Sequence, residues 1–390
     1  MTSTTASGAV RVRPEDCDLD DFVALLRTDT DLAQYPFADD TVRGALFYGP
    51  ETQARAEADL QFREDLSDEV VGALLDGPGI VVFPGAFGPR HALAETTEAF
   101  GAMIAEQRAA GTAAGDHFAE NGVNDRVWNA LQKLAVRSPE LFVQYYSNNV
   151  LNLVSTAWLG PMYQVTSSIN QVNPGGRQQS PHRDYHLGFM SPESAGRFRV
   201  QAHEISPALT LQGAVAHVDM PIESGPPMYL PYSQRYRKGY LAFHLPEFAA
   251  YFAEHHVQLP LHAGDAVFFN PALFHAAGAN VSADIARMAN LLQISSAFGR
   301  AMEAVDRSAM LRATYPALTA LAAIDRRAAD NAVAATAEGY AFPSNLDLDQ
   351  PVDGMHGETQ AELTKRAIDS EMTPERFAAE LSALDARRIP

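Results

Sequence analysis

Residues 180–186 read SPHRDYH, and His275 and Arg287 follow about a hundred positions later. On a strand, side chains at positions i and i+2 point to the same side, so His182 and Asp184 can both face one point. Two neutral imidazoles and one carboxylate suit Fe(II), and their facial arrangement leaves three of six coordination positions open. The pattern therefore predicts a metal site made by His182, Asp184 and His275.

A second His-x-Asp triplet, His217-Val218-Asp219, competes for this role. In a chain with 12 histidines, about one such triplet is expected by chance, so the motif alone is weak. The second triplet ends the apolar strand predicted at 209–220 and continues into PIESGP at 221–226, where polar residues usually close a hairpin. It also leaves too few strands before His275 to carry the chain round a barrel. We therefore assign the metal pair to His182 and Asp184.

His275 and Arg287 each have a structural and a functional interpretation. A lone histidine among apolar neighbours, as in FFNPALFHAAG at 268–278, is more often a hydrogen-bonded core residue than a metal ligand. An arginine among apolar neighbours needs an anion. That anion is either a structural carboxylate or the distal carboxylate of a dicarboxylic cosubstrate, which a guanidinium fork can bind. The order H-x-D, several strands, His, then Arg favours the functional interpretation of both residues.

Composition limits the class of protein. The chain has 390 residues, 46% of them hydrophobic and 20% charged, which is typical of a soluble globular protein with a sizeable core. Its net charge of −19 argues against nucleic acid or an anionic membrane as partner, because both need a basic footprint. A single cysteine, Cys17, excludes an internal disulfide and a cysteine metal site. The N-terminal stretch MTSTTASGAVRV lacks the apolar core of a signal peptide, so we expect a cytoplasmic protein.

Periodicity predicts one β core with helical extensions at both ends. We expect residues 1–66 to form a helical N-terminal extension, residues 67–298 the core with inserted helices, and residues 299–390 a helical C-terminal extension packed on that core. Ser67 is a candidate N-cap for a short helix that ends at Leu75. Other helices are expected at 91–108, 124–135, 139–157, 234–256 and from Thr373, with Pro374 in the first helical position.

The expected strands are short and separated by Gly/Pro turns, which suggests a sandwich or a barrel. The first is the β-branched run GIVVF at 79–83. Further candidates lie at 162–172, 209–220, 228–230, 257–261, 266–269 and 287–295.

Four segments carry a resemblance to a known family. They are GIVVFPGAF at 79–87, PHRDYH at 181–186, ESGPPMYLPYSQ at 223–234 and GDAVFFNPALFHAAGANVSADIAR at 264–287. Residues 160–295 resemble the phytanoyl-CoA dioxygenase (PhyH) family of Fe(II)/2-oxoglutarate oxygenases, with Ser224, Tyr232 and Gln234 as departures. The resemblance implies a mostly β, double-stranded β-helix core (jelly roll, cupin-like). It also implies Fe(2+), 2-oxoglutarate and O2 as cofactor and cosubstrates, with His182, Asp184 and His275 as iron ligands and Arg287 as the 2-oxoglutarate anchor.

One departure concerns the cosubstrate. Family members often place a hydroxyl two residues after the distal histidine, where it shares the carboxylate with the arginine; here that position is Ala277. Thr210 is a candidate replacement, and Gln171 is a candidate cosubstrate-binding group. His186 and Asn173 are candidate substrate-contacting residues, and His186 would line the pocket if the strand continued past Asp184.

The resemblance leaves the reaction and the substrate open. Related halogenases have Gly or Ala in place of the aspartate, so Asp184 favours hydroxylation of an unactivated C–H bond, with release of succinate and CO2, or desaturation or ring closure. The alternatives are a cupin-like metal enzyme that does not use 2-oxoglutarate and a catalytically silent jelly-roll interaction protein. We expect a small-molecule substrate, which the net charge pushes slightly towards a neutral or cationic one, and a monomer or homodimer.

Overall fold

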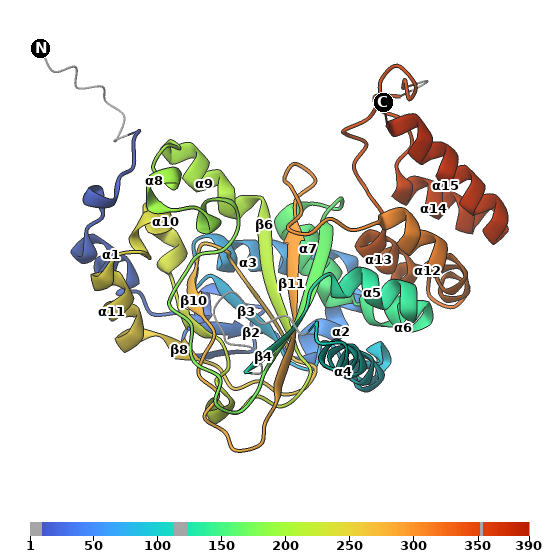
Figure 1. Cartoon of the computed structure of the whole chain (residues 1–390). Coiled ribbons are helices and arrows are strands. Elements are labelled where there is room, and N and C mark those ends of the chain that lie inside the picture. Colours follow the sequence, from blue (N-terminus) through green and yellow to red (C-terminus); the bar gives the residue numbers. More distant parts are fainter. Residues whose placement is uncertain (1–9, 113–122, 352–353, 390) are drawn as a thin grey trace, which may run out of the picture.

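The computed structural model describes residues 10–112, 123–351 and 354–389, and its centre is an eight-stranded sheet (Figure 1). The strands of this sheet are β1 (Asp40–Val42), β2 (Ala45–Phe47), β3 (Ile80–Phe83), β4 (Asn124–Val127), β5 (Gln164–Val172), β6 (Thr210–Ala216), β9 (Ala266–Phe269) and β11 (Arg287–Ser295). Their spatial order is β1-β2-β3-β9-β6-β11-β5-β4. All neighbours are antiparallel except β2 and β3, which are parallel.

A second, three-stranded sheet has the order β10-β7-β8. Its strands are β7 (Met228–Leu230), β8 (Val257–Gln258) and β10 (Phe274–Ala276). His182 forms an isolated antiparallel bridge with His275 and so adds the segment 180–184 to the edge of this sheet. An apolar cluster that includes Ile80 and Phe269 of the large sheet and Tyr229 of the small one joins the two sheets. The double-stranded β-helix core is thereby confirmed.

Fifteen α-helices surround the two sheets within the described residues. They are α1 (Leu19–Leu26), α2 (Pro50–Ala58), α3 (Leu60–Leu75), α4 (Leu93–Ala109), α5 (Ala130–Arg137), α6 (Pro139–Tyr146), α7 (Asn149–Leu159), α8 (Pro192–Ala195), α9 (Val200–Ala208), α10 (Gly239–Ala242), α11 (Pro246–His255), α12 (Arg307–Ala322), α13 (Arg326–Thr336), α14 (Gln360–Asp369) and α15 (Pro374–Arg388). Short 3-10 helices are η1 (Pro14–Asp16), η2 (Leu32–Gln34), η3 (Pro89–His91), η4 (His186–Phe189), η5 (Ile222–Ser224) and η6 (Ser233–Arg235). None of these described helices is both long and apolar enough to cross a membrane.

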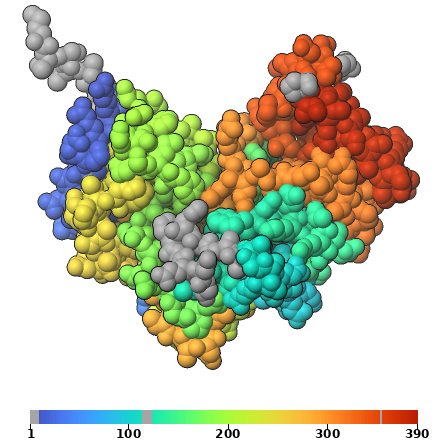
Figure 2. Space-filling view, viewed as in Figure 1, coloured from blue at the N-terminus to red at the C-terminus, as the bar shows by residue number. Residues whose placement is uncertain are grey.

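The helices from α4 to α7 pack on the outer face of the large sheet and share its largest apolar cluster with α12 and α13. α12 contacts α5 and α6, so the C-terminal part of the chain attaches to the core mainly through this helical layer. Figure 2 shows a V-shaped hollow between the segment around α8 and α9 (green) and the C-terminal helices (orange and red).

The N-terminal extension is less helical than expected. β1 and β2 lie within residues 1–66 and extend the large sheet beyond β3. Ser67 is not an N-cap: it lies inside α3, where its hydroxyl donates to Arg63 O at 2.8 Å. The helix begins seven residues earlier, because the Asp59 carboxylate accepts from two amides of its first turn. The first nine residues, which contribute to the expectation of no signal peptide, lie outside the described residues.

Two of the expected helices also differ from the structure. The segment expected at 124–135 starts as strand β4, because its backbone pairs with β5, and only then forms α5. The helix expected at 139–157 is two helices, and Asn148 caps the second by accepting from the amides of Val150 and Leu151. The final helix is as predicted, with Thr373 as N-cap and Pro374 in the first turn.

Candidate metal centre and cosubstrate cavity

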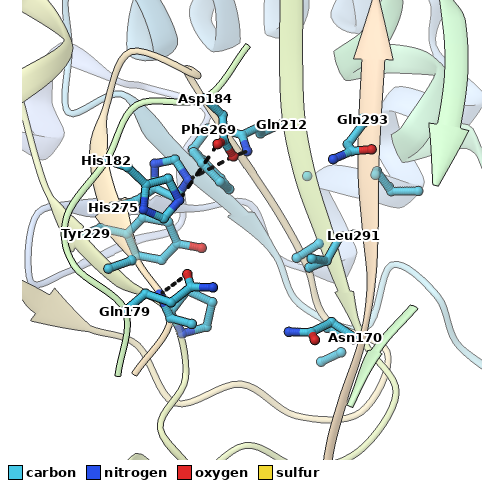
Figure 3. Close-up of a pocket in the computed structure, with 18 of the residues that line it drawn as sticks. Asn170, Gln179, His182, Asp184, Gln212, Tyr229, Phe269, His275, Leu291 and Gln293 are labelled. Atoms are coloured by element: carbon cyan, nitrogen blue, oxygen red, sulfur yellow. Dashed lines mark hydrogen bonds and ion pairs between the residues drawn. The ribbon is translucent and has the colours of Figure 1, made fainter. Parts of the chain in front are cut away.

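His182, Asp184 and His275 converge on one point (Figure 3). One ligand atom from each lies within 4.8 Å of the others. Asp184 Oδ2 is 3.4 Å from His275 Nε2, and Asp184 Oδ1 is 3.8 Å from His182 Nε2. His275 comes from β10, and the other two come from the segment that follows β5. The three candidate ligands are thus brought together from two places in the chain.

Backbone hydrogen bonds fix the two histidines. His182 N donates to His275 O at 3.0 Å, and His275 N donates back to His182 O at 3.2 Å. Each ring has its Nδ1 2.9 Å from a nearby carbonyl oxygen, that of Ser180 for His182 and that of Leu273 for His275. Since a carbonyl can only accept, both Nδ1 atoms carry the proton and both Nε2 atoms keep a lone pair for a metal.

Asp184 is held by the backbone and by Gln212. Its amide donates to Pro271 O at 3.3 Å, and the Gln212 side-chain amide from β6 donates to its carboxylate. Burial raises the pKa of Asp184, but the neighbouring His182 and His275 and the Gln212 bond outweigh it, so the pKa lies well below its usual range. The group is a carboxylate at neutral pH and is held in one orientation.

This donor set fits a divalent iron ion. Two Nε2 lone pairs and one carboxylate face a common point, which is the set of acceptors that a cation needs. Imidazole and carboxylate together suit Fe(II), and a three-ligand facial set leaves positions for exogenous ligands. Cysteine is absent from the cluster, which excludes a thiolate site of the structural zinc type.

The three ligands open into a cavity of about 160 Å³ between the two sheets. Much of its described lining is apolar: Ala214, Ala216, Met220, Leu261, Phe269, Ala289 and Leu291. Its charged lining consists of Asp184, Arg126 and Arg287, so Asp184 is the only carboxylate among the lining residues that the structure describes. Arg126 stacks on Trp128, with its Cζ 4.6 Å from the ring centroid. The net charge of the chain is therefore not reflected in this cavity, which carries two guanidiniums.

Arg287 begins β11 and points into the cavity with only 4% of its surface exposed. It donates to the backbone carbonyls of Ser224 at 3.2 Å and Gly278 at 3.3 Å. In the described part of the chain it forms no ion pair with a carboxylate. Burial lowers its pKa to about 10, so it is still a cation at neutral pH. A buried cation held only by carbonyl dipoles can bind an anion from outside the chain.

Thr210 cannot take the role of the missing hydroxyl. It lies opposite Ser295 at the far end of β11, eight residues from Arg287, which is about 27 Å along a strand. Its hydroxyl therefore cannot share a carboxylate with Arg287. The sequence suggested Thr210 as a replacement hydroxyl, whereas the antiparallel register puts that end of β6 away from Arg287.

The polar candidates next to the metal motif also point elsewhere. The Gln171 side chain donates to Asn173 Oδ1 at 2.9 Å, and Asn173 donates to Asp125 at 2.8 Å. The neighbouring residue Asn170 lines the cavity in their place, because successive side chains on β5 alternate between its two faces. If the cavity-facing side of β5 had been known, the same alternation would have selected Asn170 instead of Gln171.

His186 does not face the metal, because the extended segment ends at Asp184. Tyr185 and His186 have φ angles of 64° and 41°, in the left-handed region. The His186 ring lies 3.1 Å from Ser206 Oγ and is absent from the described cavity lining. Gln212 and Tyr229, which the sequence analysis did not select, both line the cavity; they lie on strands whose register the local sequence does not reveal.

The second His-x-Asp triplet separates into two unrelated contacts. Asp219 is an exposed partner of His262, at 3.6 Å. His217 is buried on the helical side of the large sheet, with Nδ1 2.8 Å from Thr97 Oγ1 and Nε2 3.0 Å from the Tyr145 hydroxyl. Thr97 already donates to Leu93 O, so it accepts from Nδ1, and Tyr145 donates to Nε2. This arrangement accommodates only a neutral ring.

We expect the free energy of unfolding of the protein to fall on acidification because of His217. Burial lowers the pKa of His217 to about 3, below the ordinary value near 6.5. The unfolded chain therefore binds a proton between these values that the folded chain does not. Stability contributed by the neutral ring is present above pH ~6.5 and is lost as pH falls below it, by up to ~1.4 kcal/mol per pH unit.

Urea unfolding at pH 7 and pH 5 tests this expectation. His217→Gln should unfold more easily at pH 7 and should lose less stability than wild type between pH 7 and pH 5. The control is His262→Gln, at a histidine whose side chain is 87% exposed, which should match wild type at pH 7. Equal pH dependence in wild type and His217→Gln would contradict the role assigned to His217.

A double-stranded β-helix that directs two histidines and one carboxylate to an open point defines the class of mononuclear non-haem metal oxygenases. Arg287 adds to the same cavity a buried cation that can bind a carboxylate. The family model for phytanoyl-CoA dioxygenase (PhyH) matches residues 75–289. The chain belongs to this family of Fe(II)/2-oxoglutarate oxygenases.

Several solved structures are similar to this chain. EctD from S. alaskensis with bound Fe is 18% identical, with a TM-score of 0.44 over 60% of this chain and 78% of that one. The carbocyclase SnoK from nogalamycin biosynthesis is 23% identical, with a TM-score of 0.41 over 60% and 86%. The epimerase SnoN, in complex with Fe3+, alpha ketoglutarate and nogalamycin RO, is 20% identical, with a TM-score of 0.38 over 61% and 85%. No curated protein sequence matches the chain. These likenesses are too distant to indicate a reaction.

Proposed function

We propose that this protein hydroxylates an unactivated C–H bond of a small molecule, using Fe(II), 2-oxoglutarate and O2 and releasing succinate and CO2. The observation that carries the proposal is the placement of two complementary features in one cavity. The His182, Asp184 and His275 ligands supply a divalent-metal site, and Arg287 supplies a buried cation whose described partners are carbonyls only. A metal chelator with a distal carboxylate would engage both.

Each residue has a defined part in this function. Once bound, iron and 2-oxoglutarate supply the chemistry that oxidises the substrate C–H bond, with O2 as the oxidant. His182, Asp184 and His275 hold the metal, and Gln212 keeps the Asp184 carboxylate turned towards it. Arg287 holds the distal carboxylate of the cosubstrate. The apolar lining limits the entry of water to the reacting groups.

Two features bear on the reaction outcome and the substrate. Asp184 occupies the position that halogenases leave open for halide, which favours hydroxylation over halogenation. Arg126 and Arg287 line the cavity while Asp184, a metal ligand, is its only described carboxylate. Arg287 is assigned to the cosubstrate, so its charge does not select the substrate, and we propose a small molecule whose charge the panel described below would identify.

Replacing Arg287 with alanine should weaken 2-oxoglutarate binding by about 100-fold, because a charge-assisted, bidentate contact is lost. Iron affinity should stay close to wild type, since Arg287 donates to carbonyls and touches no ligand. The measurement is anaerobic addition of 2-oxoglutarate to the Fe(II)-loaded protein, followed through the weak visible charge-transfer band. The control is Arg197→Ala, at an arginine whose side chain is 76% exposed, which should titrate like wild type.

The same titration separates the proposal from its alternatives. Iron binding without a 2-oxoglutarate band, and without succinate under O2, would favour a cupin-like metal enzyme that does not use this cosubstrate. No iron binding at all would favour a silent fold used for interaction. Succinate release stimulated by one member of a panel of neutral, anionic and cationic small molecules would identify the substrate class.

A further inference from the structure

Tyr229 is a buried cavity residue with an unsatisfied hydroxyl. It lies at the centre of β7, directly opposite His275 of β10. Its ring packs edge-on against Phe269, with centroids 5.1 Å apart, which fixes the direction of the side chain. Figure 3 shows its hydroxyl pointing into the cavity beside the two histidines. Only 1% of the residue is exposed, and the hydroxyl has no hydrogen-bond partner within the described chain.

An unpartnered hydroxyl at such a place indicates a missing ligand group. A buried polar group without a partner is costly and is rare in folded proteins. A phenol keeps its proton at neutral pH and remains a donor. Tyr229 and the buried cation Arg287 both line the cavity, which brings together the neutral donor and the cation that a carboxylate needs.

The position that often carries a hydroxyl in this family is Ala277, and it has no hydroxyl to donate. Its backbone amide is already used, because it donates to Gln179 Oε1 at 3.1 Å. Ala277 lines the cavity together with Tyr229 and Arg287. The strand pairing that places Tyr229 opposite His275 brings its side chain to the same cavity wall from β7.

We propose that the Tyr229 hydroxyl donates a hydrogen bond to the distal carboxylate of 2-oxoglutarate, beside Arg287, and so replaces the hydroxyl that Ala277 lacks. This inference rests on the proposed use of 2-oxoglutarate. It makes Tyr229 a cosubstrate-binding residue and explains why a tyrosine is buried in the cavity with its hydroxyl unpaired.

Anaerobic titration of Fe(II)-loaded variants with 2-oxoglutarate tests the proposal. Tyr229→Phe should raise the dissociation constant about tenfold, which corresponds to one lost hydrogen bond to a charged group, with iron affinity unchanged. Adding Ala277→Ser to Tyr229→Phe should recover part of the loss, because the serine supplies a hydroxyl at the same cavity wall. The control is Tyr315→Phe, at a buried tyrosine of α12 whose hydroxyl donates to Met372 O, which should bind like wild type.

Comparison with a second 2-oxoacid isolates the contribution of the distal carboxylate to binding. 2-Oxobutyrate has the chelating group but no distal carboxylate, so wild type and Tyr229→Phe should bind it equally. An unchanged 2-oxoglutarate affinity in Tyr229→Phe, or an equal loss with both acids, would overturn the assignment while leaving the proposed function intact. An altered affinity for the substrate alone would likewise overturn it. Absence of a band in wild type would instead refute the use of 2-oxoglutarate itself.

Discussion

Replacing Asp184 with alanine should reduce substrate-dependent succinate formation by at least about 1000-fold. The substitution removes the only charged ligand and leaves two neutral imidazoles at the site. In the wild-type protein the Gln212 amide donates to this carboxylate. In the variant the amide would face the cavity without that partner. Because a divalent cation depends on the carboxylate for charge neutralisation, iron affinity should fall together with turnover.

Iron titration and succinate assays on purified protein check this expectation. Gln212→Ala is the graded comparison, because it keeps all three ligands and removes only the hydrogen bond that orients one of them. It should cost roughly 10- to 100-fold in metal affinity or activity. Iron binding and turnover by Asp184→Ala within a few fold of wild type would show that the metal lies elsewhere. A urea midpoint close to that of wild type would confirm that the variant is folded.

The ligand set could be predicted because its signal is carried by order along the chain. His182 and Asp184 are two residues apart, and a short extended segment is enough to turn both to one side. His275 needed only a strand that returns to the same edge, which the observed bridge between His182 and His275 provides. Arg287 could be selected because a buried arginine always requires an explanation.

The residues that complete the site could not be selected from local sequence. Gln212 and Tyr229 reach the cavity from β6 and β7, and which of their neighbours faces inward depends on strand register. The same dependence made Thr210 a wrong candidate. The left-handed backbone at His186 had no local signal either, since neither it nor its neighbour Tyr185 is a glycine. In each case the pairing of distant segments decided the outcome.

Arg183 lies between His182 and Asp184 in the sequence, and its side chain anchors the segment that carries these two ligands. Its guanidinium is buried between the rings of Tyr240 and Phe274, with Cζ 5.2 Å from each centroid. It donates to Ser233 O at 2.6 Å and Tyr236 O at 3.0 Å. Burial lowers its pKa to about 10, so it is a cation held by carbonyls and aromatic faces.

Gly239→Ala should destabilise the fold by about 3–5 kcal/mol, because it removes the space that this guanidinium occupies. A Cβ at position 239 would lie 1.9 Å from Arg183 Cζ and 2.1 Å from its Nη2. The buried arginine would have to leave its carbonyl partners, and the segment that carries His182 and Asp184 would move with it. Iron affinity should therefore fall along with the urea midpoint. Gly72→Ala is the control, since nothing lies within 4 Å of its Cβ position, and alanine in a helix should be stabilising by ~0.5–1 kcal/mol.

A double-mutant cycle separates displacement of Arg183 from a backbone effect at Gly239. Arg183→Met removes the group that the new Cβ would strike while it retains a long apolar side chain. If the clash is the cause, Gly239→Ala should cost much less in the Arg183→Met background than in wild type, since the two residues are in direct contact. Equal costs in both backgrounds would place the effect in the start of α10. Such a result would also break the proposed link between this glycine and the metal segment.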